Sequence, residues 1–150
     1  MMQSNLYESD FYAWTLEQAK LLKTGDFGHL DIAHLVEEIE ALGRQERQEL
    51  KNRLGVLIGH LLKWEYQPER RSKSWRVTIQ MQRREIKDLL EENPSLQSYL
   101  TKAIAKAYLA GLDLVCLETP LDYPDLPPTC PYTLEQLLDP DFPRDLYPTE

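Results

Sequence analysis

The stretch Leu54-Gly-Val-Leu-Ile-Gly-His-Leu-Leu-Lys-Trp64 is the longest apolar run in a chain in which 28% of the residues are charged. Stepping about 100° per residue along a helix places its large apolar side chains within an arc of about 160°. These side chains are Leu54, Leu57, Ile58, Leu61, Leu62 and Trp64. Burying six such side chains is worth about 10–15 kcal/mol before the entropy cost of ordering them. The stretch is therefore predicted to be the core segment of a helix.

Small and polar residues flank this arc. Gly55 and Gly59 fall just beyond one edge, where they permit a neighbouring helix to approach the backbone closely. His60 falls at the other edge, so helical geometry predicts a hydrogen-bonded residue at the border between core and surface. His29 and His34 lie in a turn and in a first helical turn, and we expect both to be solvated.

The helix extends well beyond the apolar run. Asp31 is a good N-cap, and Pro68 ends the element. Between these ends, the segment Gly43-Arg-Gln-Glu-Arg-Gln-Glu49 is polar but favours helix after its glycine. A straight helix over residues 31–66 is about 50 Å long, which exceeds the diameter of a compact domain of this size. We expect an unbroken or gently bent helix, because one glycine costs only about 1 kcal/mol; a kink near Gly43 is the alternative.

Three further helices are predicted from the same apolar periodicity and from their end signals. Gly25 is placed to end the first of them. Ser72 or Ser74 can cap the helix that follows the long one, and Asn93 caps the last. The predicted helices cover residues 9–24, 31–66, 72–92 and 94–117.

The composition of the chain changes after Thr119. Eight of the ten prolines lie between Pro120 and Pro148, so no long helix can form there. Apolar side chains are spread through this segment, which is not typical of a disordered tail. The capping box Thr133-Leu-Glu-Gln136 predicts a short helix near residues 133–138. We expect the tail, residues 119–150, to wrap the helices in an extended path.

The predicted fold class is all-α: a bundle of four principal helices with one long central helix and a proline-rich extended C-terminal wrap. At 150 residues the chain fits a single domain, residues 1–150. It has no run of about 18 apolar residues and no signal-peptide pattern. Its two cysteines form no disulfide or metal-ligand pattern. We therefore expect a cytoplasmic protein with no membrane partner.

Short motifs are spaced along nearly the whole chain. They are Asp10-Phe-Tyr-Ala-Trp14, Glu37-Glu-Ile-Glu40, His60-Leu-Leu-Lys-Trp64, Tyr66-Gln-Pro68, Arg71-Ser72, Ser74-Trp75, Gln82-Arg83 and Pro94-Ser-Leu96. With this set the chain resembles, from Asp10 to about Leu138, a bacterial family catalogued as domain of unknown function twenty-nine. The resemblance implies a small all-helical protein. It implies no activity, so the function must be argued from the residues themselves.

The sharpest chemical hypothesis is a polar site inside the bundle. Its candidate residues are Glu38, His60, Trp64, Gln82 and Arg83. A carboxylate–imidazole pair suits acid–base chemistry or metal binding. However, Glu38 and His60 lie about 33 Å apart on a straight helix, and the chain lacks the inward Glu-x-x-His pairs of bundle metal sites. We therefore predict no catalytic residue, no metal ligand and no cofactor.

A second hypothesis is an anion-binding site on the basic stretch, residues 70–87. This stretch has seven basic residues and one acidic residue, or +6, whereas the chain as a whole carries −8. The candidate anion-binding residues are Arg70, Arg71, Lys73 and Arg76. Alternatively, the segment 118–150, with eight acidic residues and one basic residue, compensates this charge. The acidity of the whole chain favours compensation, so nucleic acid is not an expected partner.

A third hypothesis is self-association. A long helix with a polar middle and apolar ends can pair with its counterpart in an antiparallel dimer, whereas a kink would keep the monomer compact. We predict a non-enzymatic interaction protein whose partner is a protein, with self-association as the first expectation. Two alternatives stay open: a metal or acid–base site using Glu38 and His60, and an anion- or nucleic-acid-binding regulator using residues 70–87.

Overall fold

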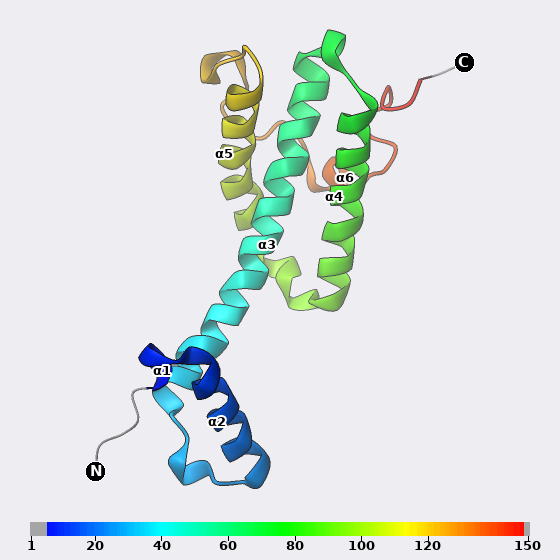
Figure 1. Ribbon diagram of the computed structural model, residues 1–150. Helices are drawn as coiled ribbons and strands as arrows, with labels where there is room; N and C mark the ends of the chain where they lie inside the picture. The colour runs from blue at the N-terminus through cyan, green and yellow to red at the C-terminus, as the bar shows by residue number, and fades with distance from the viewer. Residues whose placement is uncertain (1–5, 149–150) are drawn as a thin grey trace. The chain divides into compact units, whose positions relative to one another are not determined.

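The computed structural model describes residues 6–148, which form helices joined by loops, with no β-strand among them (Figure 1). Four of the helices are long. The α-helices are α1 (Leu6–Ser9), α2 (Phe11–Thr24), α3 (Ile32–Tyr66), α4 (Lys73–Glu92), α5 (Leu100–Glu118) and α6 (Leu134–Leu138). Short 3₁₀ helices are η1 (Phe27–His29), η2 (Pro68–Arg70), η3 (Pro94–Tyr99) and η4 (Tyr123–Asp125). The all-α class is confirmed; the ends of the predicted domain and tail, residues 1–5 and 149–150, lie outside the described part.

The chain divides into two compact units, residues 1–45 and residues 46–150. Helix α3 begins in the first unit and ends in the second, and it is helical over all 35 of its residues, including Gly43. A Cβ built on Gly43 meets no described atom within 4 Å, so no packing contact requires glycine there. The expectation of one domain over residues 1–150 stays a prediction, since the two units share this helix.

The first unit contains α1, α2 and the beginning of α3. The predicted helix over residues 9–24 is interrupted at Asp10, whose extended φ of −152° separates α1 from α2. The Asp10 carboxylate then accepts a hydrogen bond from the N–H of Ala13 at 3.1 Å and caps α2. Gly25 ends α2 as predicted, with a left-handed φ of 74° that favours glycine.

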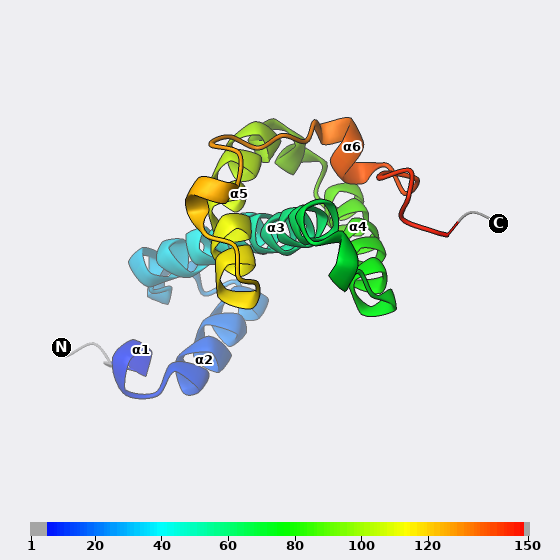
Figure 2. The ribbon, with the colours of Figure 1, turned by 90° about the horizontal axis from the view of Figure 1, so that it is seen from above.

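The second unit is built around the rest of α3, which lies between α4 and α5 (Figures 1 and 2). The apolar face predicted for the stretch Leu54–Trp64 is the core face. Its six large side chains are at most 4% exposed: Leu54, Leu57, Ile58, Leu61, Leu62 and Trp64. From α4, Ile79 and Ile86 are fully buried in the same core.

Helices α3 and α5 approach closely where both carry small residues. A Cβ built on Gly111 of α5 would lie 3.2 Å from the backbone N of Gly59 and 3.3 Å from the backbone O of Gly55. A Cβ on Gly55 would in turn lie 3.2 Å from the Cβ of Ala110. These distances leave no room for a larger side chain, so the close approach predicted from the glycine spacing is confirmed.

Helix α4 begins at a predicted cap, whereas α5 begins later than predicted. Ser72 caps α4, because its hydroxyl accepts a hydrogen bond from the N–H of Trp75 at 3.2 Å. The last long helix, expected over residues 94–117, begins instead with the 3₁₀ helix η3 and becomes α-helical only at Leu100. Such 3₁₀ turns are common at the start of α-helices, and the apolar spacing of this segment does not distinguish the two forms.

The proline-rich tail completes the core of the second unit. It crosses from α5 to α4 along one side of the helices (Figure 2). Leu126, Leu137 and Leu146 of the tail are at most 6% exposed and belong to the core. Thr133 and Gln136 form both halves of the predicted capping box around α6. The wrap is therefore a packed part of the fold, as the fold-class prediction requires.

Candidate functional site

The predicted polar site is divided between the two units. Glu38 belongs to the first unit, where its carboxylate accepts a hydrogen bond from the Tyr7 hydroxyl at 2.5 Å. The other four candidates belong to the second unit: His60, Trp64, Gln82 and Arg83. Glu38 thus has its own partner within the first unit. The other four candidates are described below without a contribution from Glu38.

His60 lies on α3 at the border between core and surface. Its Nδ1 lies 2.8 Å from the carbonyl oxygen of Val56, one turn earlier, to which a neutral imidazole donates. Burial lowers the pKa of His60 below its ordinary value, and the positive charge of Lys63 lowers it further. The ring is therefore neutral at pH 7, with its Nδ1 engaged by its own helix.

Trp64 and the basic stretch meet the tail at Asp145. The Trp64 indole N–H donates to Oδ1 of Asp145 at 3.2 Å, and Nη1 of Arg71 donates to Oδ2 at 2.7 Å. The Arg71 guanidinium also lies 4.8 Å from the centre of the Trp64 ring. Burial raises the pKa of Asp145, but these hydrogen bonds outweigh it and hold the pKa below its ordinary value. The cluster fastens the tail to the end of α3 and to the turn before α4.

Arg83 is a buried cation in the middle of α4. It is only 4% exposed, and its guanidinium donates to the carbonyl oxygens of Leu137 and Gln136 at 2.8 and 3.1 Å. A third hydrogen bond, of 3.2 Å, goes to Oε1 of Gln80. Burial lowers its pKa to about 10, which still leaves it charged at pH 7. Gln82, also buried, accepts a hydrogen bond from Arg53 at 3.3 Å.

The candidate anion-binding residues have different environments. Arg70 and Lys73 are exposed and form no ion pair with residues 6–148. The Arg76 guanidinium lies 5.0 Å from the centre of the Tyr147 ring. Arg71 pairs with Asp145, the one acidic side chain within residues 118–148 that forms an ion pair with the basic stretch. Acidic side chains of the tail therefore cover only part of the basic charge.

A polar cluster in the first unit contains His34, which we expected to be solvated but whose side chain is only 35% exposed. Nδ1 of His34 lies 2.7 Å from Oδ2 of Asp31, and the same oxygen accepts a hydrogen bond from the Trp14 indole at 3.0 Å. The Tyr7 ring stacks on the His34 ring with centroids 3.7 Å apart. The spacing Asp31-x-x-His34 was the signal for this contact, but the aromatic partners come from α1 and α2. The cluster holds α1 and α2 against α3.

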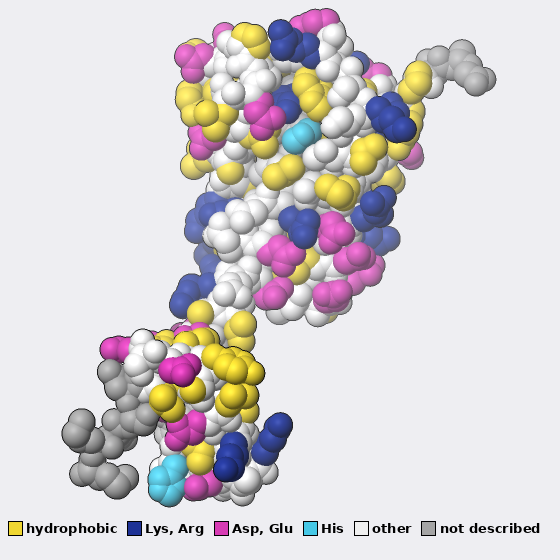
Figure 3. All heavy atoms as spheres, viewed as in Figure 1, with side chains coloured by type: hydrophobic (Ala, Val, Ile, Leu, Met, Phe, Trp, Pro, Cys, Tyr) yellow, Lys and Arg dark blue, Asp and Glu magenta, His cyan; other side chains and the backbone are white. Residues whose placement is uncertain are grey.

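One face of α3 in the first unit is apolar and exposed. We call it the apolar stripe; it consists of Ile32, Val36, Ile39 and Leu42, which are 63, 48, 66 and 61% exposed. On an ideal helix these residues lie within about 60° of the direction of Ile39, so the four share one face of α3. Figure 3 shows hydrophobic side chains gathered on one side of the first unit.

The chain was also compared with known proteins. The family model described as domain of unknown function DUF29 matches residues 6–143. The chain belongs to this family. The match covers nearly all of the part that the structure describes, in agreement with the resemblance seen in the spaced motifs. No curated protein and no solved structure matches the chain.

The DUF29 family carries no assigned activity, so its name adds no chemistry to the site. Within residues 6–148, no group of three or more His, Cys, Asp or Glu side chains could hold a metal ion. None of the described helices is long and apolar enough to cross a membrane. In this family member, the most distinctive surface feature is therefore the apolar stripe together with its surroundings on α2.

Proposed function

We propose that this protein is a non-enzymatic interaction protein that self-associates through the apolar stripe. The observation that carries this proposal is the low burial of the first unit. Among its described residues only Trp14 and Gln18 are buried. Its exposed large hydrophobic residues are Phe11, Tyr12, Leu16, Leu22, Phe27, Ile32, Val36, Ile39 and Leu42. A helical unit with this composition lacks a core of its own and is stabilised by a covering partner.

The exposed apolar area of the first unit is sufficient for a stable dimer when the apolar stripe, which supplies less than half of it, is taken together with the five exposed side chains outside the stripe. These nine side chains are 47–72% exposed. With about 150–200 Å² for a side chain of this size, they present on the order of 900 Å². A standard interface buries about 800 Å² on each partner. A second copy that covered most of this surface would reach that size.

The order of charges along α3 favours an antiparallel second copy. The apolar stripe begins after Asp31 and ends before Arg44, whose side chain forms no ion pair with a described residue. Antiparallel pairing brings Arg44 of each copy beside Asp31 of the other, whereas parallel pairing brings like charges together. Antiparallel pairing makes the two Arg44–Asp31 contacts equivalent, so the assembly is closed at two copies.

The expectations for the location and for other partners rest on the sequence and not on a contact in the structure. A cytoplasmic location and the absence of a nucleic-acid partner stay our proposals, and the net charge of −8 supports the second. The metal or acid–base alternative has no support from the geometry, because Glu38 and His60 each have a partner within their own unit. Self-association is the proposal that can be tested directly.

The test is light scattering after size exclusion, with a matched pair of variants. We expect the chain to elute with twice its mass of 17.6 kDa. Ile39→Glu places a charge in the centre of the stripe and should weaken association by at least about 100-fold. The control is Leu117→Glu, the same kind of change on α5 at a residue that is 86% exposed; it should leave the dimer intact.

Two results would contradict self-association through the stripe. The first is a monomeric mass for the unmodified chain at the highest attainable concentration. This result would mean that a second copy does not cover the stripe, and that its partner would have to be a different protein. The second is a dimer that Ile39→Glu and Leu117→Glu weaken equally, which would place the contact elsewhere. Circular dichroism of both variants shows whether the helices are retained.

A further inference from the structure

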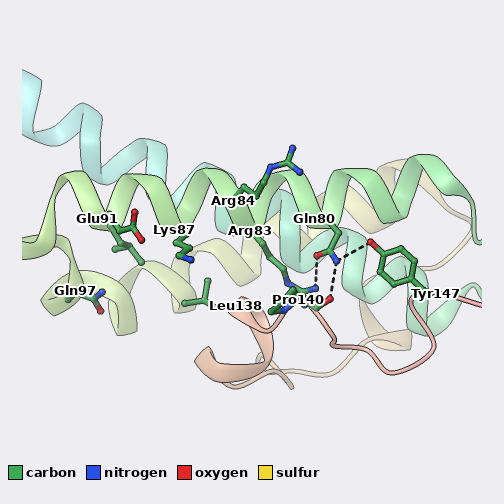
Figure 4. A pocket seen from close by; sticks show the side chains of 10 residues that line it. Gln80, Arg83, Arg84, Lys87, Glu91, Gln97, Leu138, Pro140 and Tyr147 are labelled. Atoms are coloured by element: carbon green, nitrogen blue, oxygen red, sulfur yellow. Dashed lines mark hydrogen bonds between the residues drawn. The ribbon is translucent and has the colours of Figure 1, made fainter.

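A groove lies between α4, η3 and the tail in the second unit, and we call it the α4–tail groove. Its volume is about 740 Å³, within the range of about 300–1,000 Å³ typical of small-molecule sites. It is lined by Gln80, Arg83, Arg84, Lys87, Leu90, Glu91, Gln97, Leu138, Pro140 and Tyr147. Figure 4 shows Arg83 and Lys87 directed toward the tail, whereas the guanidinium of Arg84 points away from it.

The cations of this groove form no ion pair with the residues that the structure describes. Arg83 is bonded to two backbone carbonyls and one amide oxygen, and no described carboxylate lies within ion-pair distance of it. Lys87 is exposed and also lacks an ion pair with the described residues. Glu91 is the acidic residue among those lining the groove. The carboxylate of Asp139 acts on Arg83 electrostatically, but all described hydrogen bonds of Arg83 go to neutral acceptors. A buried guanidinium of this kind attracts an anion, because its surroundings have a low dielectric constant.

The rest of the lining suits a ligand with an apolar body. Leu90 is 6% exposed, and together with Leu138 and Pro140 it gives the groove an apolar wall. Near one end, the Gln80 side-chain amide donates to the carbonyl oxygen of Pro140 at 2.9 Å and lies 3.3 Å from the Tyr147 hydroxyl. Small-molecule sites combine such apolar walls with a few fixed polar groups.

We propose that the α4–tail groove binds a small organic anion. Its carboxylate or phosphate group pairs with Lys87 and Arg83, and its apolar body packs on Leu138 and Pro140. The site is distinct from the candidate residues Arg70, Arg71, Lys73 and Arg76, none of which lines this groove. It also lies in a different unit from the apolar stripe, so it can be tested independently of self-association.

The test is isothermal titration of the full chain with three probes that share a phenyl ring. Phenyl phosphate and phenylacetate carry the two candidate head groups, and benzyl alcohol carries none. We expect saturable binding of at least one anion, with one site per chain, and none of the alcohol. Lys87→Gln should weaken binding about tenfold, the effect of one charge-assisted hydrogen bond. Lys73→Gln, the same change elsewhere on α4, should leave it unchanged.

The outcomes separate a built site from general electrostatic attraction. Preference for phenyl phosphate over phenylacetate, or the reverse, identifies the head group and supports the site. The proposal is overturned if neither anion binds, if the alcohol binds equally well, or if Lys73→Gln weakens binding as much as Lys87→Gln. Because Lys87 is exposed, its variant should fold, and circular dichroism checks this. Arg83→Lys, which keeps the charge but loses the planar guanidinium, should weaken binding without abolishing it.

Discussion

The two units bury the apolar residues of the helix that they share to very different degrees. In the second unit, Leu50, Leu54 and Leu57 of α3 are fully buried beneath α4, α5 and the tail. In the first unit, Ile32 and Ile39 of the same helix are 63 and 66% exposed. The periodicity of the sequence is the same in both. The difference lies in how much chain is available to cover these residues.

This difference indicates where stability and function are located. The second unit has two long helices and a packed tail around α3, so its apolar residues stabilise the fold directly. In the first unit only α1 and α2 accompany α3, and their contacts with it include the polar cluster at Asp31 and His34. An apolar face left open in this way is available for a partner, whereas a covered one is not.

The largest expected effect comes from shortening one apolar residue of α3 in each unit. Leu57→Ala creates a cavity in the core and should lower the free energy of unfolding by about 2–5 kcal/mol. Ile39→Ala removes an exposed side chain and should change the monomer by less than about 0.5 kcal/mol. Urea denaturation at low protein concentration, where a dimer is dissociated, measures both values.

This pair of variants can refute the comparison. A loss of about 2 kcal/mol or more for Ile39→Ala at low concentration would show that the first unit covers this residue within the monomer. A loss below about 1 kcal/mol for Leu57→Ala would show that the core of the second unit is loosely packed. Repeating Ile39→Ala at high concentration adds the contribution of self-association, which should appear only there.

A smaller effect is expected from two glycines on the long helices. Gly111→Ala places a Cβ 3.1 Å from Cγ2 of Ile58 and 3.2 Å from the backbone N of Gly59, so α3 and α5 must separate. We expect a loss of about 1–3 kcal/mol in the free energy of unfolding. Gly43→Ala meets no described atom within 4 Å and should stabilise the helix by up to about 1 kcal/mol. Thermal unfolding of both variants should shift the midpoints in opposite directions; shifts of the same sign would contradict the observed packing.

The fold could be predicted from the sequence to the extent that it depends on local patterns. The core face of Leu54–Trp64, the caps at Ser72 and Thr133, and the left-handed Gly25 are all properties of short segments. The short helix α1 was not predicted, because its four residues are too few to show an apolar period. The exposed fraction of Ile39 could not be derived from the sequence, because a helical period identifies an apolar face but does not specify what covers it.

The candidate site was harder to predict, because its contacts join segments far apart in the chain. Arg83 is held by backbone carbonyls of Gln136 and Leu137, and no side-chain pattern encodes a carbonyl partner. Asp145 is one of several acidic residues in the tail, and only packing decides that it pairs with Arg71. The basic stretch predicted an anion site near the start of α4. The location of the α4–tail groove depends on the path of the tail, which the sequence does not specify.

The smallest effect concerns two histidines whose pKa values shift in opposite directions from the ordinary value of 6.5. The hydrogen bond to Asp31 raises the pKa of His34 in the first unit. Burial lowers the pKa of His60 in the second unit, and Lys63 adds to this effect. The contribution of His34 to stability is therefore fully present below about pH 6.5 and is lost as the pH rises through its raised pKa. That of His60 has the opposite sign, being present above about pH 6.5 and lost as the pH falls through its lowered pKa.

Acidification from pH 8 to pH 5.5 should therefore strengthen the contacts of the first unit around His34 and weaken the second unit around His60. Proton NMR titration of the ring Cε1–H signals measures both pKa values, with His34→Gln and His60→Gln to assign them. His29, whose pKa is raised by its hydrogen bond to Asp26, is an internal reference, because it titrates above 6.5 without stacking on an aromatic ring. Midpoints of His34 and His60 on the same side of 6.5 would show that one ring lacks its described partner. Midpoints on opposite sides would show that the two units respond to protons with opposite sign although they share one helix.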